Sequence, residues 1–355
     1  MSTAYTVQRG DNLSIIARRH GLRSWRDIYF HPENEAFRRL RPNPNLIYAG
    51  DVVLIPDVGT GSPTPPRPGS PTELERDLEA YLMRKRQRDA ITHVAGRSGL
   101  VLLGETHVGK RQKANFLAGV ANRLARHTPA FHASEHFMND PRTQVAIQNY
   151  VFASSGASLS RARRLLPDAV RPFEPILDAA RQAPGHRYAI IASDTFAQGE
   201  DPRHNGIHAS FNASIVRHNR LHGMNQLNRL RKGNFLLGAA HAARRHVLGR
   251  ATPTTCMLLI RDGWPVHVIR LTVNVVGGMT PGGAITAGEG IDLEPLDGSG
   301  AAFDLLPILN RVAGGSPFYA DLRETGSPFA RVKSAAEGNN PFSELFDEIL
   351  HLPSP

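Results

Sequence analysis

The segment Leu100-Val101-Leu102-Leu103-Gly104-Glu105-Thr106-His107 shows most clearly how this chain is built. Four apolar residues stop at a glycine, and two ionisable side chains follow at alternate positions. Short apolar runs that end in this way are typical of strands buried in a parallel sheet. The segment therefore predicts an inner strand over residues 100–103 that delivers Glu105 and His107 to one edge of the sheet.

Three more segments repeat this pattern. Apolar runs at 130–133, 188–191 and 235–237 lead into Ser134-Glu135-His136, Ser193-Asp194 and Gly238-Ala239-Ala240-His241. Open α/β sheets bind ligands just beyond the carboxyl ends of their strands. We therefore expect Glu105, His107, Glu135 and His241 to lie along one edge, and Asp194 to have a matching position on a further strand.

Strand and helix patterns alternate over most of the chain. Helices are predicted over Thr72 to Arg88, about 110–126, within 140–183 and about 209–231; strands are predicted at 100–103, 130–134, 187–192, 234–238, 255–261 and 265–272. Such alternation predicts an α/β domain with a mostly parallel sheet flanked by helices. Strand-like character returns at 318–323 and 345–350.

Composition limits the class of protein and its partners. The chain has 355 residues, 41% of them hydrophobic, which suffices for one large and one small folded domain. A net charge of +10 favours anionic partners such as headgroups or cell-wall polymers. No arginine run alternates with aromatic residues, so no specific nucleic-acid module is predicted. The single cysteine, Cys256, excludes an intrachain disulfide and reads as an inert core thiol.

The chain carries no sequence signal for a membrane span or a classical signal peptide. No stretch approaches the roughly 20 apolar residues that a spanning helix needs, and no basic stretch precedes an apolar core near residue 1. We therefore expect synthesis in the cytoplasm. Any export is expected to follow a non-classical or contractile injection route.

A Pro/Gly/Ser-rich stretch at 58–71 separates two units, at 1–57 and 72–355. This composition is typical of an extended linker without a core of its own. The first unit reads as a short strand, a helix that begins at Asp11 or Asn12, a second helix near 25–40 and a returning strand. Two folding units joined by a tether are therefore predicted.

The two ends of the first unit carry specific motifs. It opens with Tyr5-Thr6-Val7-Gln8-Arg9-Gly10-Asp11-Asn12-Leu13 and closes with Gly50-Asp51-Val52-Val53-Leu54-Ile55-Pro56. Over nearly its whole length the unit resembles the LysM carbohydrate-binding module. The resemblance implies binding of peptidoglycan or another N-acetylglucosamine glycan in a groove that here comprises Gly10, Asp11, Asn12, Leu13, Asn45 and Ile47. Its long, basic middle is similar to LysM modules on phage-tail and contractile injection proteins, which implies docking to secretion or tail proteins as the alternative.

Glu105 and His107 form the centre of the candidate site in the second unit. A carboxylate beside an imidazole fixes its tautomer and raises its basicity, as a general base that activates water requires. The plainer interpretation is a helix cap with a satisfied histidine. Glu105, His107, Glu135 and His241 are also a workable ligand set for a divalent metal such as Zn, Mn or Co, and a metal-free acid/base site stays open. Arg217 and Arg244 are candidates for holding an oxyanion or an anionic substrate.

Gly104-Glu105-Thr106-His107, Glu135, the segment 171–180 and Gly238-Ala239-Ala240-His241 together resemble the superfamily of ChaN haem-binding proteins, TIKI/TraB proteins and erythromycin esterases, over roughly residues 90–272. The resemblance implies that His107 activates water, that Glu105 and Glu135 orient it, and that Arg217 and His241 line the opposite wall. Lys110 stands near the position of a family arginine, and Arg244 stands where esterases have a second histidine.

These observations predict a hydrolase of an ester or amide bond that residues 1–57 target to peptidoglycan or to a secretion apparatus. Two alternatives stay open. One is a non-catalytic haem- or ligand-binding protein of the ChaN type. The other is a LysM-docked component or effector of a contractile injection system.

Overall fold

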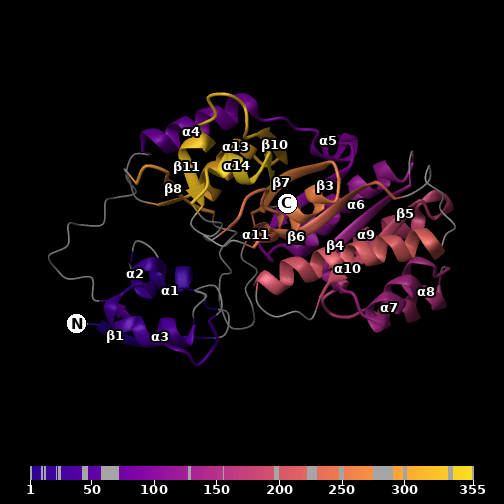
Figure 1. Ribbon diagram of the computed structural model, residues 1–355, viewed down its shortest axis with the longest axis horizontal. Coiled ribbons are helices and arrows are strands. Elements are labelled where there is room, and N and C mark those ends of the chain that lie inside the picture. The colour runs from indigo at the N-terminus through magenta and orange to yellow at the C-terminus, as the bar shows by residue number, and fades with distance from the viewer. Residues whose placement is uncertain are drawn as a thin grey trace. The chain divides into compact units, whose positions relative to one another are not determined.

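The computed structural model describes residues 2–8, 11, 13–20, 22, 25–41, 47–56, 72–126, 129–154, 156–195, 200–221, 230–247, 252–274, 291–298, 302–334 and 339–353. Contacts within the chain divide it into two compact units, of which the first extends to Glu73 and the second begins at Leu74. Figure 1 shows both units, and each is described by itself. None of the helices within the described ranges has the length and apolar character that crossing a membrane demands.

The first unit is a two-stranded sheet covered by short helices. Strands β1 (Ser2–Thr6) and β2 (Val52–Pro56) pair antiparallel, and α1 (Leu13–Arg19), α2 (Trp25–Tyr29), η1 (Pro32–Asn34) and α3 (Glu35–Leu40) lie between them in sequence. The single helix expected near 25–40 is broken at Pro32, because proline has no N–H to donate to the preceding turn. The buried Asn34 amide instead donates to the carbonyls of Ile28 and Leu54, at 2.7 Å each.

The second unit is an α/β domain around a seven-stranded sheet. Its strands are β3 (Leu100–Glu105), β4 (Ala130–Met138), β5 (Tyr188–Asp194), β6 (Lys232–Gly238), β7 (Val266–Val273), β10 (Phe318–Asp321) and β12 (Glu348–Leu352), in the spatial order β10-β12-β7-β3-β6-β4-β5. Every neighbouring pair is parallel except β10 and β12. The predicted class, a mostly parallel sheet flanked by helices, is confirmed.

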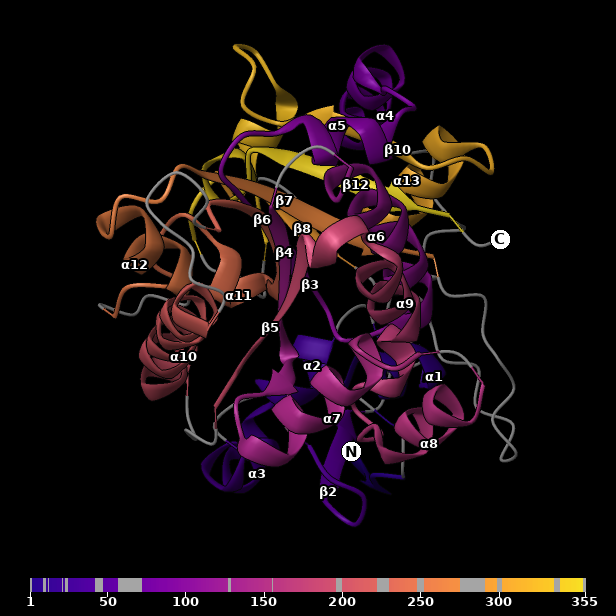
Figure 2. The same ribbon diagram turned by 90° about the vertical axis from the view of Figure 1, so that its right-hand side faces the viewer.

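Helices cover both faces of this sheet, as Figure 2 shows with the strands seen nearly edge-on. On one face lie α6 (Lys110–Leu124), α7 (Pro141–Val151) and α9 (Glu174–Gln182), with α5 (Ala90–Gly96) against α6 and α8 (Ala157–Leu165) against α7. On the other lie α10 (Glu200–Leu221), α11 (Ala239–Ala242) and α12 (Thr255–Arg261). Each face therefore has its own hydrophobic core, one around Leu117 and Phe173 and one around Phe131 and Phe235.

The strand predicted at 255–261 was wrong. These residues form α12, and the Thr254 hydroxyl caps the helix by accepting a hydrogen bond of 3.2 Å from the backbone N–H of Met257. A threonine at this position satisfies a backbone donor that the helix itself leaves open. The cap outweighs the β-like composition of the run. The helix predicted over about 209–231 begins earlier, at Glu200, and α10 is described as far as Leu221. Residues 222–229 lie outside the described residues, and the predicted end at 230–231 is not helical.

The C-terminal part completes the large sheet. Strand β12 inserts between β7 and β10, and α13 (Leu306–Ala313) and α14 (Phe342–Leu345) pack near it, while β8 (Asp292–Pro295), β9 (Phe303–Asp304) and β11 (Val332–Ser334) form a small separate sheet. Helix α4 (Glu73–Lys85) joins this part, because the Tyr81 hydroxyl donates to the carbonyl of Asp321 at 2.7 Å. The strand-like character expected at 318–323 and 345–350 is confirmed for residues 318–321 in β10 and 348–350 in β12, whereas Leu345 ends helix α14.

Candidate active site

The ends of three adjacent strands hold the predicted acid and imidazole side chains. Glu105 is the last residue of β3 and pairs in register with Gly238, the last residue of β6. Glu135 lies in β4, on the other side of β6. Helix α11 starts directly after β6 and carries His241. The parallel topology therefore brings Glu105, His107, Glu135 and His241 together, as their positions after three strand-like runs predicted.

Glu105 is the buried anchor of the cluster. Its Oε1 accepts hydrogen bonds from His107 Nδ1 at 3.0 Å and from His136 Nε2 at 2.7 Å, and its Oε2 forms an ion pair with the ammonium of Lys113. Burial opposes ionisation of this carboxyl, but the two imidazoles and Lys113 hold its pKa well below the usual range. Glu105 is therefore a permanent carboxylate at neutral pH.

The turn after β3 explains how Lys113 reaches Glu105. Gly109 adopts a φ of +61°, a left-handed conformation that glycine tolerates, and α6 starts at the next residue. One turn into α6, the buried Lys113 ammonium points back and also donates to the carbonyl of Thr106 at 2.7 Å. The first turn of α6 thus covers the Glu105 carboxylate with the Lys113 side chain, while His107 stays exposed to solvent.

His107 is the member of the cluster that solvent can reach, because 56% of its side chain is exposed. Nδ1 faces Glu105, and Nε2 lies 3.3 Å from Oε1 of Glu135. The hydrogen bond to Glu105 and the charge of Glu135 raise the pKa of His107. The carboxylates thus fix the orientation of the ring and increase its affinity for a proton.

Glu135 differs from Glu105 because little in its surroundings compensates for its burial. Oε1 accepts the backbone N–H of Gly238 at 2.7 Å, whereas Oε2 makes no hydrogen bond and lies 3.9 Å from His241 Nε2. Burial raises the pKa of Glu135 to about 7. A Cβ on Gly238 would lie 3.2 Å from Oε1 of Glu135, so a larger residue there would press on this carboxyl.

Two histidines of the cluster were not predicted as site residues. His136 donates to Glu105 and stacks on Phe173 with ring centroids 4.9 Å apart; His204, on α10, contacts His241 through the two Nδ1 atoms at 2.9 Å. Burial lowers the pKa of His136. Burial also lowers the pKa of His241 to about 3, and the electrostatic effects of His204 and Arg203 lower it further. The rings of His136 and His241 are therefore neutral at pH 7.

The sequence held only a weak signal for these two histidines. Neighbouring residues of a strand normally face opposite sides, but the pairing of β4 with β5 shifts between Ser134 and Met138, so that Glu135 and His136 both reach the cluster. His204 lies on a helix whose sequence carries two other histidines, His208 and His218. Its contact with His241 depends on how α10 packs, which no local motif encodes.

The other predicted residues lie at varying distances from this cluster. Lys110 begins α6, and its charge lowers the pKa of His107 and His136, so it lies near them. Asp194 forms an ion pair with Arg203 at 3.0 Å, and the charge of Arg203 lowers the pKa of Glu135. Arg217 instead donates to Gln144 at 2.5 Å, and Arg244 pairs with Asp347 at 2.6 Å. Among the described residues, no hydrogen bond or ion pair links Arg217 or Arg244 to the cluster around Glu105.

The side chains fit a metal ion poorly. Ligand atoms of Glu105, His107 and His136 lie within 4.8 Å of one another, which differs from the predicted set because His136 replaces Glu135 and His241. However, the Lys113 ammonium is fully buried against Glu105 and is also held by the carbonyl of Thr106. A divalent cation would have to share this carboxylate with a fixed positive charge. We therefore derive no chemical step through a metal at this edge.

The predicted glycan groove in the first unit is described only in part. Leu13 is buried in the core, and Ile47 packs against that core. The carboxylate of Asp11 accepts hydrogen bonds from the Tyr5 hydroxyl at 2.7 Å and from the backbone N–H of Gln8 at 2.9 Å. Asp11 thus organises the turn that precedes α1. Gly10, Asn12 and Asn45 lie outside the described residues.

Comparison with known proteins identifies a family within the first unit. The LysM domain family matches residues 5–26, which confirms the predicted LysM module. No curated protein matches the chain significantly in sequence. Similar solved structures include a protein from Bacillus cereus, with a TM-score of 0.45 and 11% identity over 79% of this chain and 97% of that one.

Two further structures correspond to branches of the superfamily that the motifs resemble. An erythromycin esterase variant in its open conformation has a TM-score of 0.41 and 10% identity, over 75% of this chain and 93% of that one. ChaN of Campylobacter jejuni, with cofacial haem, has a TM-score of 0.30 and 13% identity, over 56% of this chain and 88% of that one. Scores at this level carry no argument about function, which must come from the site itself.

Proposed function

We propose that the second unit hydrolyses an ester or amide bond with a metal-free pair formed by His107 and Glu135. The observation that carries this proposal is that the buried carboxyls of Glu105 and Glu135 both contact the His107 imidazole but have pKa values shifted in opposite directions. Glu105 stays ionised, whereas the pKa of Glu135 is raised to about 7 by burial. Carboxyls whose pKa values are driven apart in this way commonly divide the acid and base roles of an active site.

The distances around His107 allow a hydrolysis in which the pair first accepts a proton and then returns it. A water molecule bound at the exposed edge of His107 attacks the carbonyl carbon and gives its proton to the His107–Glu135 pair, in which Nε2 and Oε1 are 3.3 Å apart. The tetrahedral intermediate then breaks its bond to the leaving oxygen or nitrogen. The pair returns the proton to that leaving group, so the enzyme ends in its starting state. Glu105 keeps the ring oriented throughout, because it binds Nδ1.

The buried neighbours set the proton affinity of this pair. Burial lowers the pKa of His241 to about 3, so this ring is neutral at pH 7 and adds no charge to the pocket behind Glu135. Arg203, which Asp194 holds, lowers the pKa of Glu135 and so opposes the effect of its burial. A proton shared between two sites titrates with values that belong to the pair rather than to either residue.

The LysM module supports a glycan-rich location for this activity. LysM modules bind N-acetylglucosamine glycans, and the basic chain suits anionic cell-wall polymers. We include in the proposal that the module binds peptidoglycan and that the protein reaches it by a non-classical or contractile injection route. Sedimentation of the full chain with insoluble peptidoglycan tests the first point. A chain that stays in the supernatant but is retained by injection-apparatus proteins would instead favour docking.

The hydrolase proposal is tested with p-nitrophenyl acetate and with peptidoglycan fragments as substrates of the full chain. His107→Ala is expected to lower kcat/KM by about 10²–10⁴-fold while the melting temperature stays close to that of the parent. His246→Ala is the matched control, since this histidine hydrogen-bonds the Thr252 carbonyl and does not contact the cluster. A kcat/KM that His107→Ala leaves unchanged, or that falls equally in His246→Ala, contradicts the proposal.

A further inference from the structure

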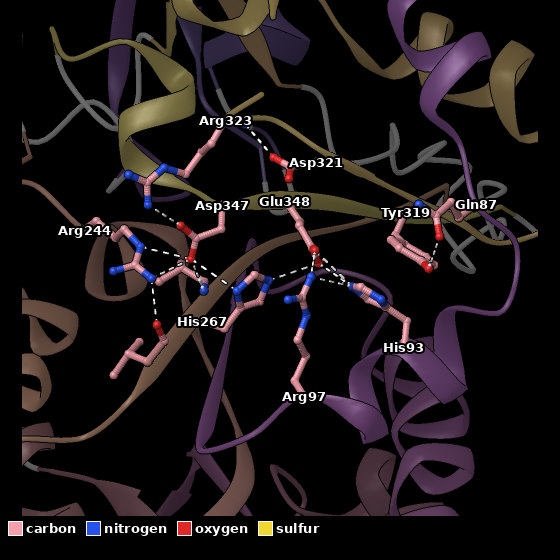
Figure 3. Close-up of polar contacts among 12 residues, drawn as sticks. Gln87, His93, Arg97, Arg244, His267, Tyr319, Asp321, Arg323, Asp347 and Glu348 are labelled. Atoms are coloured by element: carbon pink, nitrogen blue, oxygen red, sulfur yellow. Dashed lines mark hydrogen bonds and ion pairs between the residues drawn. The ribbon is translucent and has the colours of Figure 1, made fainter. Parts of the chain in front are cut away.

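A second cluster of histidine and glutamate lies at the opposite edge of the same sheet. Glu348 is the first residue of β12, His267 the second of β7, and His93 comes from α5. Figure 3 shows the two imidazoles and the Arg97 guanidinium converging on the Glu348 carboxylate. These are the amino ends of the parallel strands, so the cluster is separate from the Glu105 site at the carboxyl ends.

The three potential ligand atoms have the spacing of a coordination sphere. Oε2 of Glu348 lies 2.8 Å from His93 Nε2 and 3.1 Å from His267 Nε2, and all three atoms fall within 4.8 Å of one another. In a tetrahedral zinc site with bonds of 2.0–2.1 Å, neighbouring ligand atoms are about 3.3 Å apart.

The orientation of His267 favours an ion over a hydrogen bond. Its Nε2 is buried and makes no hydrogen bond, although a Glu348 oxygen is only 3.1 Å away, because the ring is not aligned for one. Its other nitrogen, Nδ1, lies 3.6 Å from Oδ2 of Asp347. A carboxylate beside the far nitrogen is a common neighbour of a metal-binding histidine. At 3.6 Å the Asp347 carboxylate lies beyond hydrogen-bond distance and acts on this ring through its charge.

Arg97 is the group that an ion would have to displace. Its guanidinium contacts Glu348 and lies 3.1 Å from His93 Nε2. Unlike the buried Lys113 at the other edge, the Arg97 side chain is 36% exposed and can turn into solvent. The remaining arginines of the cluster, Arg244 and Arg323, are already paired with Asp347, at 2.6 and 2.8 Å.

We propose that His93, His267 and Glu348 form a binding site for a divalent transition-metal ion of the zinc class, for which Arg97 acts as a displaceable counter-charge. Two imidazoles and one carboxylate are a donor set that suits Zn²⁺, with a water molecule as the fourth ligand. Bound there, the ion joins α5 to β7 and to β12. Because it binds the folded state, it stabilises the domain by an amount that rises with the logarithm of its concentration once this exceeds the Kd.

The test measures zinc affinity by chelator competition and zinc-dependent melting temperature. All variants of the full chain carry His107→Ala as well, which removes a ligand of the opposite cluster. His267→Ala and His93→Phe are expected to weaken zinc binding at least 100-fold and to remove the rise in melting temperature. His93→Phe keeps a ring on Tyr319, on which His93 stacks at 3.7 Å. Cobalt is expected to give visible absorption bands that the same two variants lose.

The arginine distinguishes this proposal from a merely structural ion-pair network. Arg97→Ala is expected to tighten zinc binding about tenfold, since the ion no longer competes with a guanidinium. Arg245→Ala, which also removes one positive charge from a mostly exposed side chain, is expected to change nothing. The proposal is overturned by zinc affinity that His267→Ala and His93→Phe leave intact, or by an Arg97→Ala variant that binds zinc no tighter than its parent. If His267→Ala does not fold, the Arg97→Ala result decides.

Discussion

The carboxyl edge of the large sheet, where its parallel strands end, and the amino edge, where they begin, hold similar side chains in different electrostatic surroundings. At the carboxyl edge the anchoring Glu105 is paired with Lys113, whose side chain is fully buried. At the amino edge Glu348 is paired with Arg97, whose side chain is partly exposed. A fixed cation occupies its carboxylate permanently and leaves proton transfer to the neighbours, whereas a mobile cation can be exchanged for an ion. The mobility of the counter-charge therefore distinguishes the two clusters more clearly than their ligand atoms do.

The largest expected effect is a crossed loss of function between the edges. His107→Ala is expected to lower kcat/KM by about 10²–10⁴-fold, the usual contribution of a general base, and to leave the zinc-dependent rise in melting temperature intact. His267→Ala is expected to do the reverse. Ester hydrolysis and thermal melting, with and without zinc, measure both in each variant. Loss of both properties in either variant would mean that the edges are not independent.

The second prediction concerns the stability cost of Glu135. A carboxyl whose folded pKa is raised, here to about 7, binds its proton more tightly in the folded state, so stability is lost as the pH rises from about 4.5 through 7. Glu135→Gln keeps an oxygen for the Gly238 N–H and removes the charge. It is expected to raise the free energy of unfolding at pH 8 by up to about 3 kcal/mol, an advantage that vanishes near pH 4.5. Urea unfolding at pH 4.5, 6 and 8 measures the difference.

Glu348 is expected to show the opposite sign. Its folded pKa is lowered to about 2, so its stabilisation is present above the unfolded value and is lost as the pH falls from about 4.5 through 2. Glu348→Gln is expected to lower the free energy of unfolding at pH 7 by up to about 3 kcal/mol. The gap to the parent should close on acidification, as metal-free urea unfolding can show. A gap that stays constant down to pH 3 would contradict the assignment.

The smallest effect is expected from Asp194→Asn. Arg203 would lose its carboxylate partner, and its unbalanced charge would favour the ionised form of Glu135. The acidic limb of the rate profile should therefore move to lower pH by less than about one unit. A pH series of kcat/KM measures the shift, and Asp168→Asn, at an exposed ion pair, is the control. A shift toward higher pH would exclude this coupling.

The carboxyl edge could be predicted from the sequence, because each of its main residues ends a recognisable strand. Glu105, Glu135 and His241 follow apolar runs, and parallel topology then forces their strand ends to meet. The amino edge could not. His93 and Glu348 are 255 positions apart, and they meet only because β12 joins the sheet beside β7. His267 precedes its strand's apolar run, where a polar residue ordinarily faces solvent, so the sequence gives no sign of its role.

The insertion of β12 between β7 and β10 has a consequence for synthesis on the ribosome. Residues 348–352 form an inner strand, hydrogen-bonded on both sides, so the sheet cannot close before this segment has left the exit tunnel. Until then β7 is the outermost of the parallel strands, and its unpaired backbone N–H and C=O groups can pair with strands of other chains. A nascent chain stalled before residue 348 should therefore depend on chaperones, while one released beyond it should not.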